Sequence, residues 1–421
     1  MHIARDKIHC AICGSISNRT TDVDDTVLCE HCFKFLPKPL NKWRRDFIID
    51  VLWLFLSIKS PVNFLQLGRY GKYGEQRYRQ QFEGSFDSFN FNAALIHQYC
   101  GQRRAIAFDP SYIPKSGRET EGVGWFWSGC ANKAKWGLEI GGIAVLDLDN
   151  HTALHLEAIQ TLPSESETLL EFYARIFNEK AKELKKLAQI VVVDGYFSKQ
   201  PFVSELTSCG LDVISRFRDD VRLRYIIQVK KTGKRGRTKT NGETVDFANM
   251  DMKHFRIEKE NEDIRIYTAL VHAVALNQLV RIAYVQFLKD GKVASTKVYF
   301  STNIEMEACE VLEMYQMRFQ IEFIYRDAKQ HTSLTTCQAR NKEKLHSHFN
   351  FSLTAVNIAK VVHWYSIPKE ERKSFSMADI KTINHNTLLL ERFITMFAIK
   401  ANVLKNNQNV KELLFYGTIA A

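Results

Sequence analysis

One segment of the chain carries an acid, two cations and a phenol at spacings that suit phosphate chemistry. Residues 315–329 read YQMRFQIEFIYRDAK and contain Tyr315, Arg318, Glu322 and Lys329. At about 100° per residue, these four side chains fall within about 60° of arc on one helix. A carboxylate there can hold a divalent cation while the neighbouring cations hold phosphate oxygens. The alternative is a solvated helix face with ordinary ion pairs.

Apolar residues elsewhere on this segment favour a buried helix. Phe319, Ile321, Phe323 and Ile324 make the predicted helix apolar around much of its circumference. Because such a helix is largely buried, we expect its charged side chains to line a cleft.

Two aspartates upstream follow predicted buried strands. Residues 105–108 (AIAF) end at Asp109, and residues 190–193 (IVVV) end at Asp194. Side chains at such strand ends project into the crevice beyond a sheet. Two competing acids, Asp147 and Asp149, alternate on one strand before a turn, and we expect them to face solvent. We therefore predict that Asp109 and Asp194 act with Glu322.

Three carboxylates can hold two divalent cations about 3.5–4 Å apart. Because the predicted ligands Asp109, Asp194 and Glu322 are all oxygen donors, we expect Mg²⁺, with Mn²⁺ as a substitute, two ions per active site. One ion activates a water molecule or a 3′-hydroxyl, and the other stabilises the leaving oxygen during displacement at phosphorus.

The spacing Tyr-x2-Arg-x3-Glu-x6-Lys resembles the YREK motif of DDE transposases from bacterial insertion sequences, specifically the insertion-sequence-four family. The blocks around Asp109 and Asp194 also resemble that family, and the resemblance covers about residues 105–360. The family typically has threonine where Ser111 stands, which is a mild departure. It commonly has arginine where Gly195 stands, and we expect this glycine to weaken one phosphate contact but not the metal site.

The resemblance implies an enzyme that cuts double-stranded DNA at element ends and joins them to target DNA. It also implies a DNA-dependent homodimer, in which Tyr315, Arg318 and Lys329 contact phosphates. Two alternatives stay open, namely a non-catalytic, transposase-derived DNA-binding regulator and a nuclease on the same fold.

Four cysteines near the start of the chain have the spacing of a zinc ribbon. Two CxxC pairs stand fifteen residues apart, and each pair supplies two thiolates to one tetrahedral ion. We therefore predict one structural Zn²⁺ held by Cys10, Cys13, Cys29 and Cys32. The alternatives are redox cysteines or a chance arrangement.

The elements that must position the carboxylates follow an RNase H-like order. We predict a mixed α/β sheet flanked by helices. Ser164 and Glu167 resemble a capping box for the first helix. The expected order is a strand at 105–108, a hairpin at 139–156, a helix at 164–187, a strand at 190–193, a helix at 198–208 and a strand at 211–217.

Residues 220–303 contain alternating segments typical of antiparallel strands and are predicted to form a β-rich insertion. A glycine-containing basic loop within it either holds DNA or forms a solvated hairpin tip. We favour DNA phosphate binding by Lys230, Lys231, Lys234, Arg235 and Arg237.

The whole chain has 421 residues, 45% of them hydrophobic, and a net charge of +11. That charge favours nucleic acid as the partner. No apolar run is long enough to cross a membrane, so we expect a cytoplasmic, nucleoid-associated bacterial protein without a membrane partner. The expected divisions are a zinc module (1–36), a helical DNA-binding region (37–104), a catalytic core (105–219 and 304–365), the β-rich insertion (220–303) and a C-terminal helical region (366–421).

Overall fold

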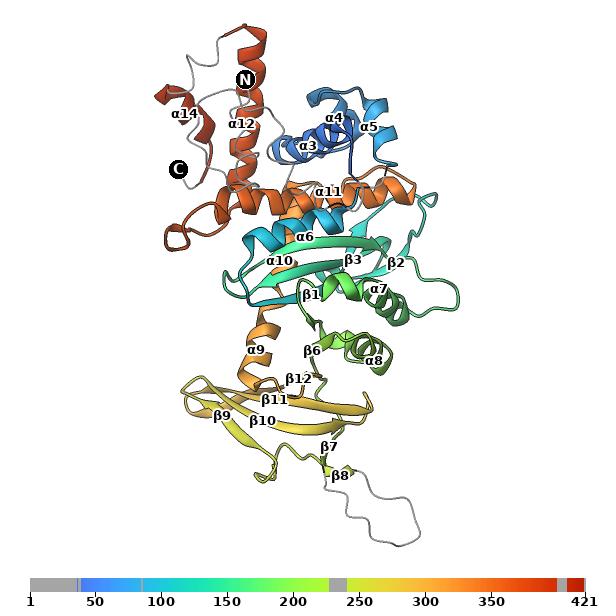
Figure 1. Ribbon diagram of the computed structural model, residues 1–421, viewed down its shortest axis with the longest axis vertical. Helices are drawn as coiled ribbons and strands as arrows, with labels where there is room; N and C mark the ends of the chain where they lie inside the picture. Colours follow the sequence, from blue (N-terminus) through green and yellow to red (C-terminus); the bar gives the residue numbers. More distant parts are fainter. Residues whose placement is uncertain (1–35, 37–38, 85, 227–240, 400–406, 420–421) are drawn as a thin grey trace.

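The computed structural model describes residues 36, 39–84, 86–226, 241–399 and 407–419. Its strands join one mixed sheet that is flanked by helices (Figure 1). This architecture confirms the predicted α/β fold class with an RNase H-like mixed sheet. No helix in these residues is long and apolar enough to cross a membrane.

The first part of the sheet is built on β1 (Arg104–Pro114) and β3 (Lys133–Asp147). These two strands pair antiparallel along the whole of β1. β3 then turns back into β4 (Thr152–Gln160), which confirms the predicted hairpin. Two details differ from expectation. β1 continues well past residue 108 because its ladder with β3 continues, and β2 (Gly124–Ser128) adds an unpredicted strand beside the start of β3.

Two short strands lie parallel to β1. β5 (Ile190–Val192) pairs with β1, and β6 (Asp212–Arg216) pairs with β5. Parallel neighbours need crossover connections, which α7 (Leu169–Leu184) and α8 (Gln200–Ser208) provide.

The start of α7 differs from the prediction. Thr168 and Glu171 form the capping box, in place of Ser164 and Glu167, because both reciprocal hydrogen bonds form at Thr168.

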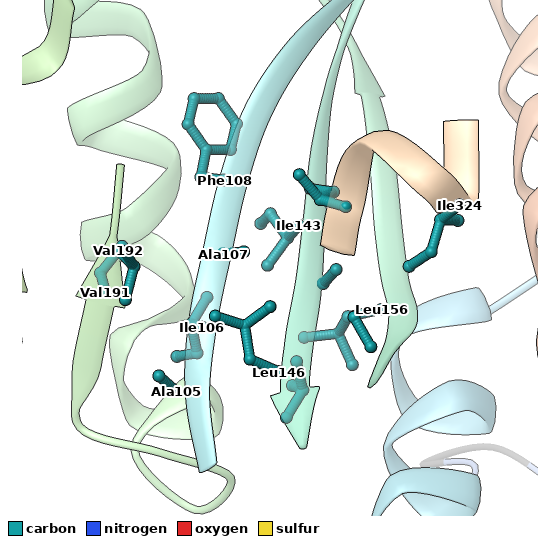
Figure 2. Packing of buried hydrophobic residues seen from close by; sticks show 14 of the residues in the cluster. Ala105, Ile106, Ala107, Phe108, Ile143, Leu146, Leu156, Val191, Val192 and Ile324 are labelled. Atoms are coloured by element: carbon teal, nitrogen blue, oxygen red, sulfur yellow. The ribbon is translucent and has the colours of Figure 1, made fainter. Parts of the chain in front are cut away.

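The core lies where these strands meet α10 (Gln320–His331). Figure 2 shows Ile106, Val191 and Leu146 from neighbouring strands, with Ile324 of α10 directed toward Leu156 of β4. All five side chains are buried. Continuous apolar runs such as residues 105–108 suit strands that are covered on both faces.

The predicted insertion extends the same sheet. β12 (Lys292–Ser301) pairs antiparallel with β6, so the β-rich part is a continuation of the central sheet. Its other strands are β7 (Leu223–Ile226), β8 (Asn241–Thr244), β9 (Arg256–Glu260), β10 (Ile264–Ala273) and β11 (Gln278–Lys289).

Helices from both ends of the chain cover β4. Asn357 accepts a hydrogen bond from the backbone N–H of His155 on β4 and donates to Asn92. Because all three are buried, this network fixes α11 (Lys342–Lys360) and α6 (Ser88–Tyr99) on the strand. The remaining helices are α3 (Lys42–Ser57), α4 (Phe64–Tyr70), α5 (Glu75–Gln81), α9 (Ala308–Met317), α12 (Met377–Met396) and α14 (Gln408–Phe415).

Asp147 is buried, which corrects the prediction that it faces solvent. Its carboxylate accepts hydrogen bonds from the N–H groups of Gly101 and Asn150 and from the hydroxyl of Tyr365. Contacts from Gly101 and Tyr365, which are distant in the sequence, make an interior position of a residue that alternation predicts to be exposed. Asp149, by contrast, is half-buried.

Candidate active site

Asp109 lies inside β1, and not at the end of the strand as the sequence suggested. It nevertheless lies just beyond the point where the neighbouring strand β5 ends. The last parallel pair between β1 and β5 is Ala107 with Val192. Asp109 and Asp194 each lie two residues beyond that pair. Because neighbouring strands run about 4.8 Å apart, this register brings the two aspartates to the same level at one end of the parallel strands.

A tyrosine from α10 holds the backbone at Asp109. The hydroxyl of buried Tyr325 donates a 2.6 Å hydrogen bond to the carbonyl oxygen of Asp109. Gly142 lies opposite Asp109 on β3, and a Cβ atom there would stand 2.0 Å from the Tyr325 hydroxyl oxygen. The absence of a side chain at Gly142 therefore lets α10 approach the strand that carries Asp109.

Asp194 begins a short 3₁₀ turn, Gly195–Phe197. Its carboxylate accepts a 3.0 Å hydrogen bond from the N–H of Tyr196. Its carbonyl oxygen accepts a 2.8 Å hydrogen bond from the hydroxyl of Ser215 on β6. The turn and the neighbouring strand together fix the direction in which this carboxylate points.

The segment 315–329 forms two helices and not the single predicted helix. α9 ends at Met317 and α10 begins at Gln320. Three-residue hydrogen bonds bridge the join, including Arg318 N–H to the Tyr315 carbonyl and Glu322 N–H to the Phe319 carbonyl. The backbone stays right-handed and tightens locally, as 3₁₀ turns do at helix ends.

Arg318, at this join, connects two of the predicted metal ligands. Its Nη1 lies 3.4 Å from Oδ1 of Asp109, and its Nη2 lies 2.9 Å from Oε1 of Glu322. The guanidinium is mostly buried, whereas half of the Glu322 side chain is exposed. Arg318 therefore neutralises Asp109 and Glu322 from a position between them.

The other two predicted phosphate-binding residues, Lys329 and Tyr315, lie on either side of Arg318. Lys329 donates a 2.8 Å hydrogen bond to the hydroxyl of Ser111, two residues beyond Asp109 on β1. Tyr315 is half-buried, and its ring lies 4.7 Å from that of Tyr299 on β12, measured between centroids. The predicted residues of segment 315–329 thus reach from β12 to the far half of β1.

The carboxylates influence one another electrostatically. Burial raises the pKa of Asp109 to about 7; Arg318 opposes this shift, and the nearby charges of Asp194 and Glu322 add to it. Burial also raises the pKa of Asp194, against the opposing effects of Arg318 and of the hydrogen bond from Tyr196. Such perturbed acids in one cluster are typical of functional sites.

In the part of the chain that the structure describes, no three histidine, cysteine or acidic side chains converge closely enough to hold one metal ion. At Asp109 and Glu322 the guanidinium of Arg318 pairs with both carboxylates. We expect that Arg318 must move aside before these carboxylates share an ion.

Two further residues of this region were not predicted from the sequence. Burial raises the pKa of both Asp194 and Tyr315, and the charge of Arg216 on β6 opposes both shifts, so Arg216 brings positive charge near these two residues. Tyr325 holds Asp109 through the hydrogen bond to its carbonyl oxygen. Arg216 is the last residue of β6, and a basic residue at the end of a predicted strand could have identified it.

Several predicted residues lie outside the described residues. They are the basic loop residues Lys230, Lys231, Lys234, Arg235 and Arg237 and the cysteines Cys10, Cys13, Cys29 and Cys32.

Comparison with known families gives a match over residues 102–358, which is 257 of the 421 residues and more than half of the chain. The matching family is described as a transposase DDE domain. No curated protein matches the chain.

Proposed function

The chain belongs to the transposase DDE domain family, and we propose from this premise that it cuts DNA at the ends of a bacterial insertion sequence and joins them to target DNA. One observation carries this proposal. The β1–β5 register brings Asp109 and Asp194 to one level, and Arg318 connects Asp109 with Glu322. We also propose membership of the insertion-sequence-four family, on the YREK spacing of segment 315–329.

The three carboxylates fit the magnesium ions that this activity requires. Asp109, Asp194 and Glu322 offer only oxygen donors, which Mg²⁺ and Mn²⁺ prefer. When bound, two such ions would activate the attacking oxygen and stabilise the leaving one. The chain itself sets the separation of these acids, because Tyr325 and the Tyr196 N–H fix the strand and turn that carry two of them.

The cations and the phenol of segment 315–329 are suited to hold the DNA backbone. Once released from the carboxylates, the planar guanidinium of Arg318 can donate two hydrogen bonds to a phosphate. Lys329 offers a point charge beside Ser111. Tyr315 offers a hydroxyl donor near Arg216, whose charge adds to the attraction for phosphate.

We propose supporting roles for the rest of the chain. A zinc module at 1–36 and helices at 37–104 would add DNA contacts, and the basic loop of the insertion at 220–303 would hold phosphates. The catalytic core would comprise 105–219 and 304–365, followed by a helical region at 366–421. The active form would be a homodimer assembled on DNA, in the cytoplasm at the bacterial nucleoid.

Single replacements of the three acids test this proposal. We expect Asp109→Ala, Asp194→Ala and Glu322→Ala to lower Mg²⁺-dependent strand cleavage by at least about a thousandfold, because each removes a ligand that the reaction needs. Binding of element ends, measured by gel shift, should persist because most phosphate contacts lie elsewhere. Full cleavage by any one of the three variants would remove that residue from the site.

The products separate the proposal from its alternatives. The substrate is a supercoiled plasmid carrying the DNA that flanks the gene. A transposase gives cleaved ends that become joined to a second DNA, and a nuclease gives hydrolysis without joining. A DNA-binding regulator gives a shifted band and no product. The three acids in one cluster argue against the regulator, because a non-catalytic protein needs no such set.

A further inference from the structure

A second surface, apart from the carboxylate cluster, has the chemistry of a nucleobase site. β2 and residues 133–137 of β3 form a two-stranded arm at the edge of the sheet, because β1 ends opposite Gly137 (Figure 1). Trp125 and Trp127 of this arm are 70% and 60% exposed. They alternate along β2 and therefore face the same side. Large exposed aromatic surfaces of this kind mark binding sites.

A third tryptophan, Trp136, contributes to a pocket on the arm. Trp136 lies directly opposite Trp125 in the ladder, and the two rings meet edge to face with centroids 5.9 Å apart. The Trp136 indole N–H donates to the Gly117 carbonyl, and its own carbonyl accepts from the Tyr112 hydroxyl. Trp136 is therefore held in place, while most of the Trp125 side chain stays exposed. Gly117, Arg118, Trp125 and Trp136 line a pocket beside these two rings.

One cation on the tryptophan side of the arm favours an anionic ligand. Arg118 lines the pocket and is exposed, and Glu119 is the exposed acid next to it. Lys133 and Lys135 alternate with Trp136 along β3, so they face the other side of the arm. A cation beside aromatic rings suits a ligand with a planar face and a phosphate backbone. A nucleobase with its adjoining phosphates has both features.

Strand β3 runs from the arm past Asp109 of the carboxylate cluster. Trp136 precedes Gly142, the partner of Asp109, by six residues on the same strand. At about 3.4 Å per residue the two points lie about 20 Å apart, which is about six base steps of DNA. One DNA segment can therefore reach both places.

We propose that the pocket of Trp125, Trp136 and Arg118, extended by Trp127, stacks unpaired nucleobases of the DNA on which the protein acts. This inference rests on the proposed DNA substrate and not on strand cleavage. Base stacking on aromatic rings is tolerant of sequence, because every base has a π face. Paired bases inside a duplex are already stacked and offer no free face to the pocket.

The test measures binding without Mg²⁺, so that it does not depend on catalysis. The probe is a short oligothymidylate with one 2-aminopurine, either single-stranded or annealed to its complement. We expect Trp125→Ala/Trp127→Ala to weaken binding of the single strand by roughly tenfold or more, and to abolish quenching of 2-aminopurine fluorescence. Affinity for the duplex should stay within about twofold. Trp125→Phe should retain stacking, and Tyr416→Ala, at a residue 78% exposed in another region, serves as the control.

Other outcomes overturn the proposal. Unchanged binding of the single strand, or equal weakening for single strand and duplex, would remove base stacking from the arm. A change in oligomeric state on sedimentation, with unchanged DNA binding, would assign this sheet edge to a second copy of the chain. Strand cleavage by the wild-type protein is measured in a separate assay. If the protein does not cleave DNA, the binding test of the tryptophans can still be interpreted, because it does not require cleavage.

Discussion

Arg318 and Asp109, separated by 209 positions in the sequence, form an ion pair across the candidate active site, with 3.4 Å between Nη1 and Oδ1. The second amino group of the same guanidinium, Nη2, forms an ion pair with Glu322. Arg318 thus occupies the position of a counter-ion between two predicted metal ligands. We therefore expect metal ions and this arginine to compete for the same negative charge.

The first prediction concerns that competition. Arg318→Ala should bind Mn²⁺ roughly tenfold more tightly than the wild type, because the acids lose their internal cation. DNA cleavage should fall, because a phosphate contact is lost with the same side chain. Titration calorimetry without DNA gives the metal affinity. Arg318→Lys keeps the charge but loses the contact with both carboxylates, so its Mn²⁺ affinity should lie between those of the wild type and Arg318→Ala. Equal Mn²⁺ affinities in all three proteins would contradict the competition.

A second prediction follows from the pKa of Asp109, which burial raises to about 7. Metal ions bind the ionised carboxylate, so Mn²⁺ affinity should fall as pH drops below 7, by about tenfold per unit for one released proton. Above pH 7 it should level off. Calorimetry in buffers of different ionisation enthalpy measures the released proton directly. Asp109→Asn should lose this proton release, and a pH-independent affinity in the wild type would refute the prediction.

The third prediction concerns the approach of α10 to β3. Gly142→Ala places a Cβ atom 2.0 Å from the Tyr325 hydroxyl oxygen. Such overpacking should lower the free energy of unfolding by about 1–3 kcal/mol and shift the strand that carries Asp109. Tyr325→Phe added to Gly142→Ala should restore part of this loss, and not all, because the ring carbon Cζ would still lie 2.9 Å away.

Urea denaturation of both single variants and the double variant gives the coupling between these two residues. Gly129→Ala is the matched control, because nothing lies within 4 Å of a Cβ atom at that position. Additive effects at Gly142 and Tyr325 would show that the two side chains do not meet.

The fourth prediction separates a buried structural acid from the candidate catalytic ones. Asp147→Ala leaves the N–H groups of Gly101 and Asn150 and the Tyr365 hydroxyl without their acceptor. Unfolding free energy should fall by about 3 kcal/mol, because buried donors are left unpaired. Asp149→Ala, at a half-buried acid nearby, should cost less. Cleavage measured well below the unfolding temperature should survive in both variants, and loss of cleavage in folded Asp147→Ala protein would give Asp147 a catalytic role.

The fifth prediction concerns the cysteine pairs. Purified protein should contain about one zinc per chain, because two CxxC pairs supply four thiolates to one ion. Cys10→Ser/Cys13→Ser should lose the metal by elemental analysis. Cys209→Ser, which changes a half-buried cysteine remote from these pairs in sequence, should keep it. Zinc content that is the same in both variants would rule out the ribbon.

Local patterns were sufficient for much of the core. Apolar runs at residues 105–108 and 190–193 predicted buried strands because such strands exclude water on both faces. The spacing of Glu322 and Lys329 predicted that both lie on one helix, which is α10. Each of these patterns depends on neighbours within a few residues, so the sequence alone carries it. The prediction of one largely buried helix over the whole of segment 315–329 was wrong, because Arg318 lies at the join before α10 and Phe319 is 44% exposed.

Boundaries and contacts between distant segments were harder to predict. β1 runs to Pro114 because β3 offers it partners beyond residue 108, and the exposed tryptophans lie on a strand, β2, that pairs only with β3. Asp147 has an alternating pattern typical of a solvent-facing residue, but it is buried, and its carboxylate accepts hydrogen bonds from Gly101 and Tyr365, which are distant in the sequence. Such packing depends on long-range contacts that no local window contains.

The sequence by itself determined which residues are the candidates for the chemistry: three acids, each beside or within a predicted element, and a set of cations at fixed spacing. Only the tertiary structure decided how they meet. The register of Ala107 with Val192 aligns Asp109 with Asp194, and the join between α9 and α10 brings Arg318 between Asp109 and Glu322. The physical reason is that strand register and helix docking are set by burial over the whole core, whereas residue spacing is set by the chain.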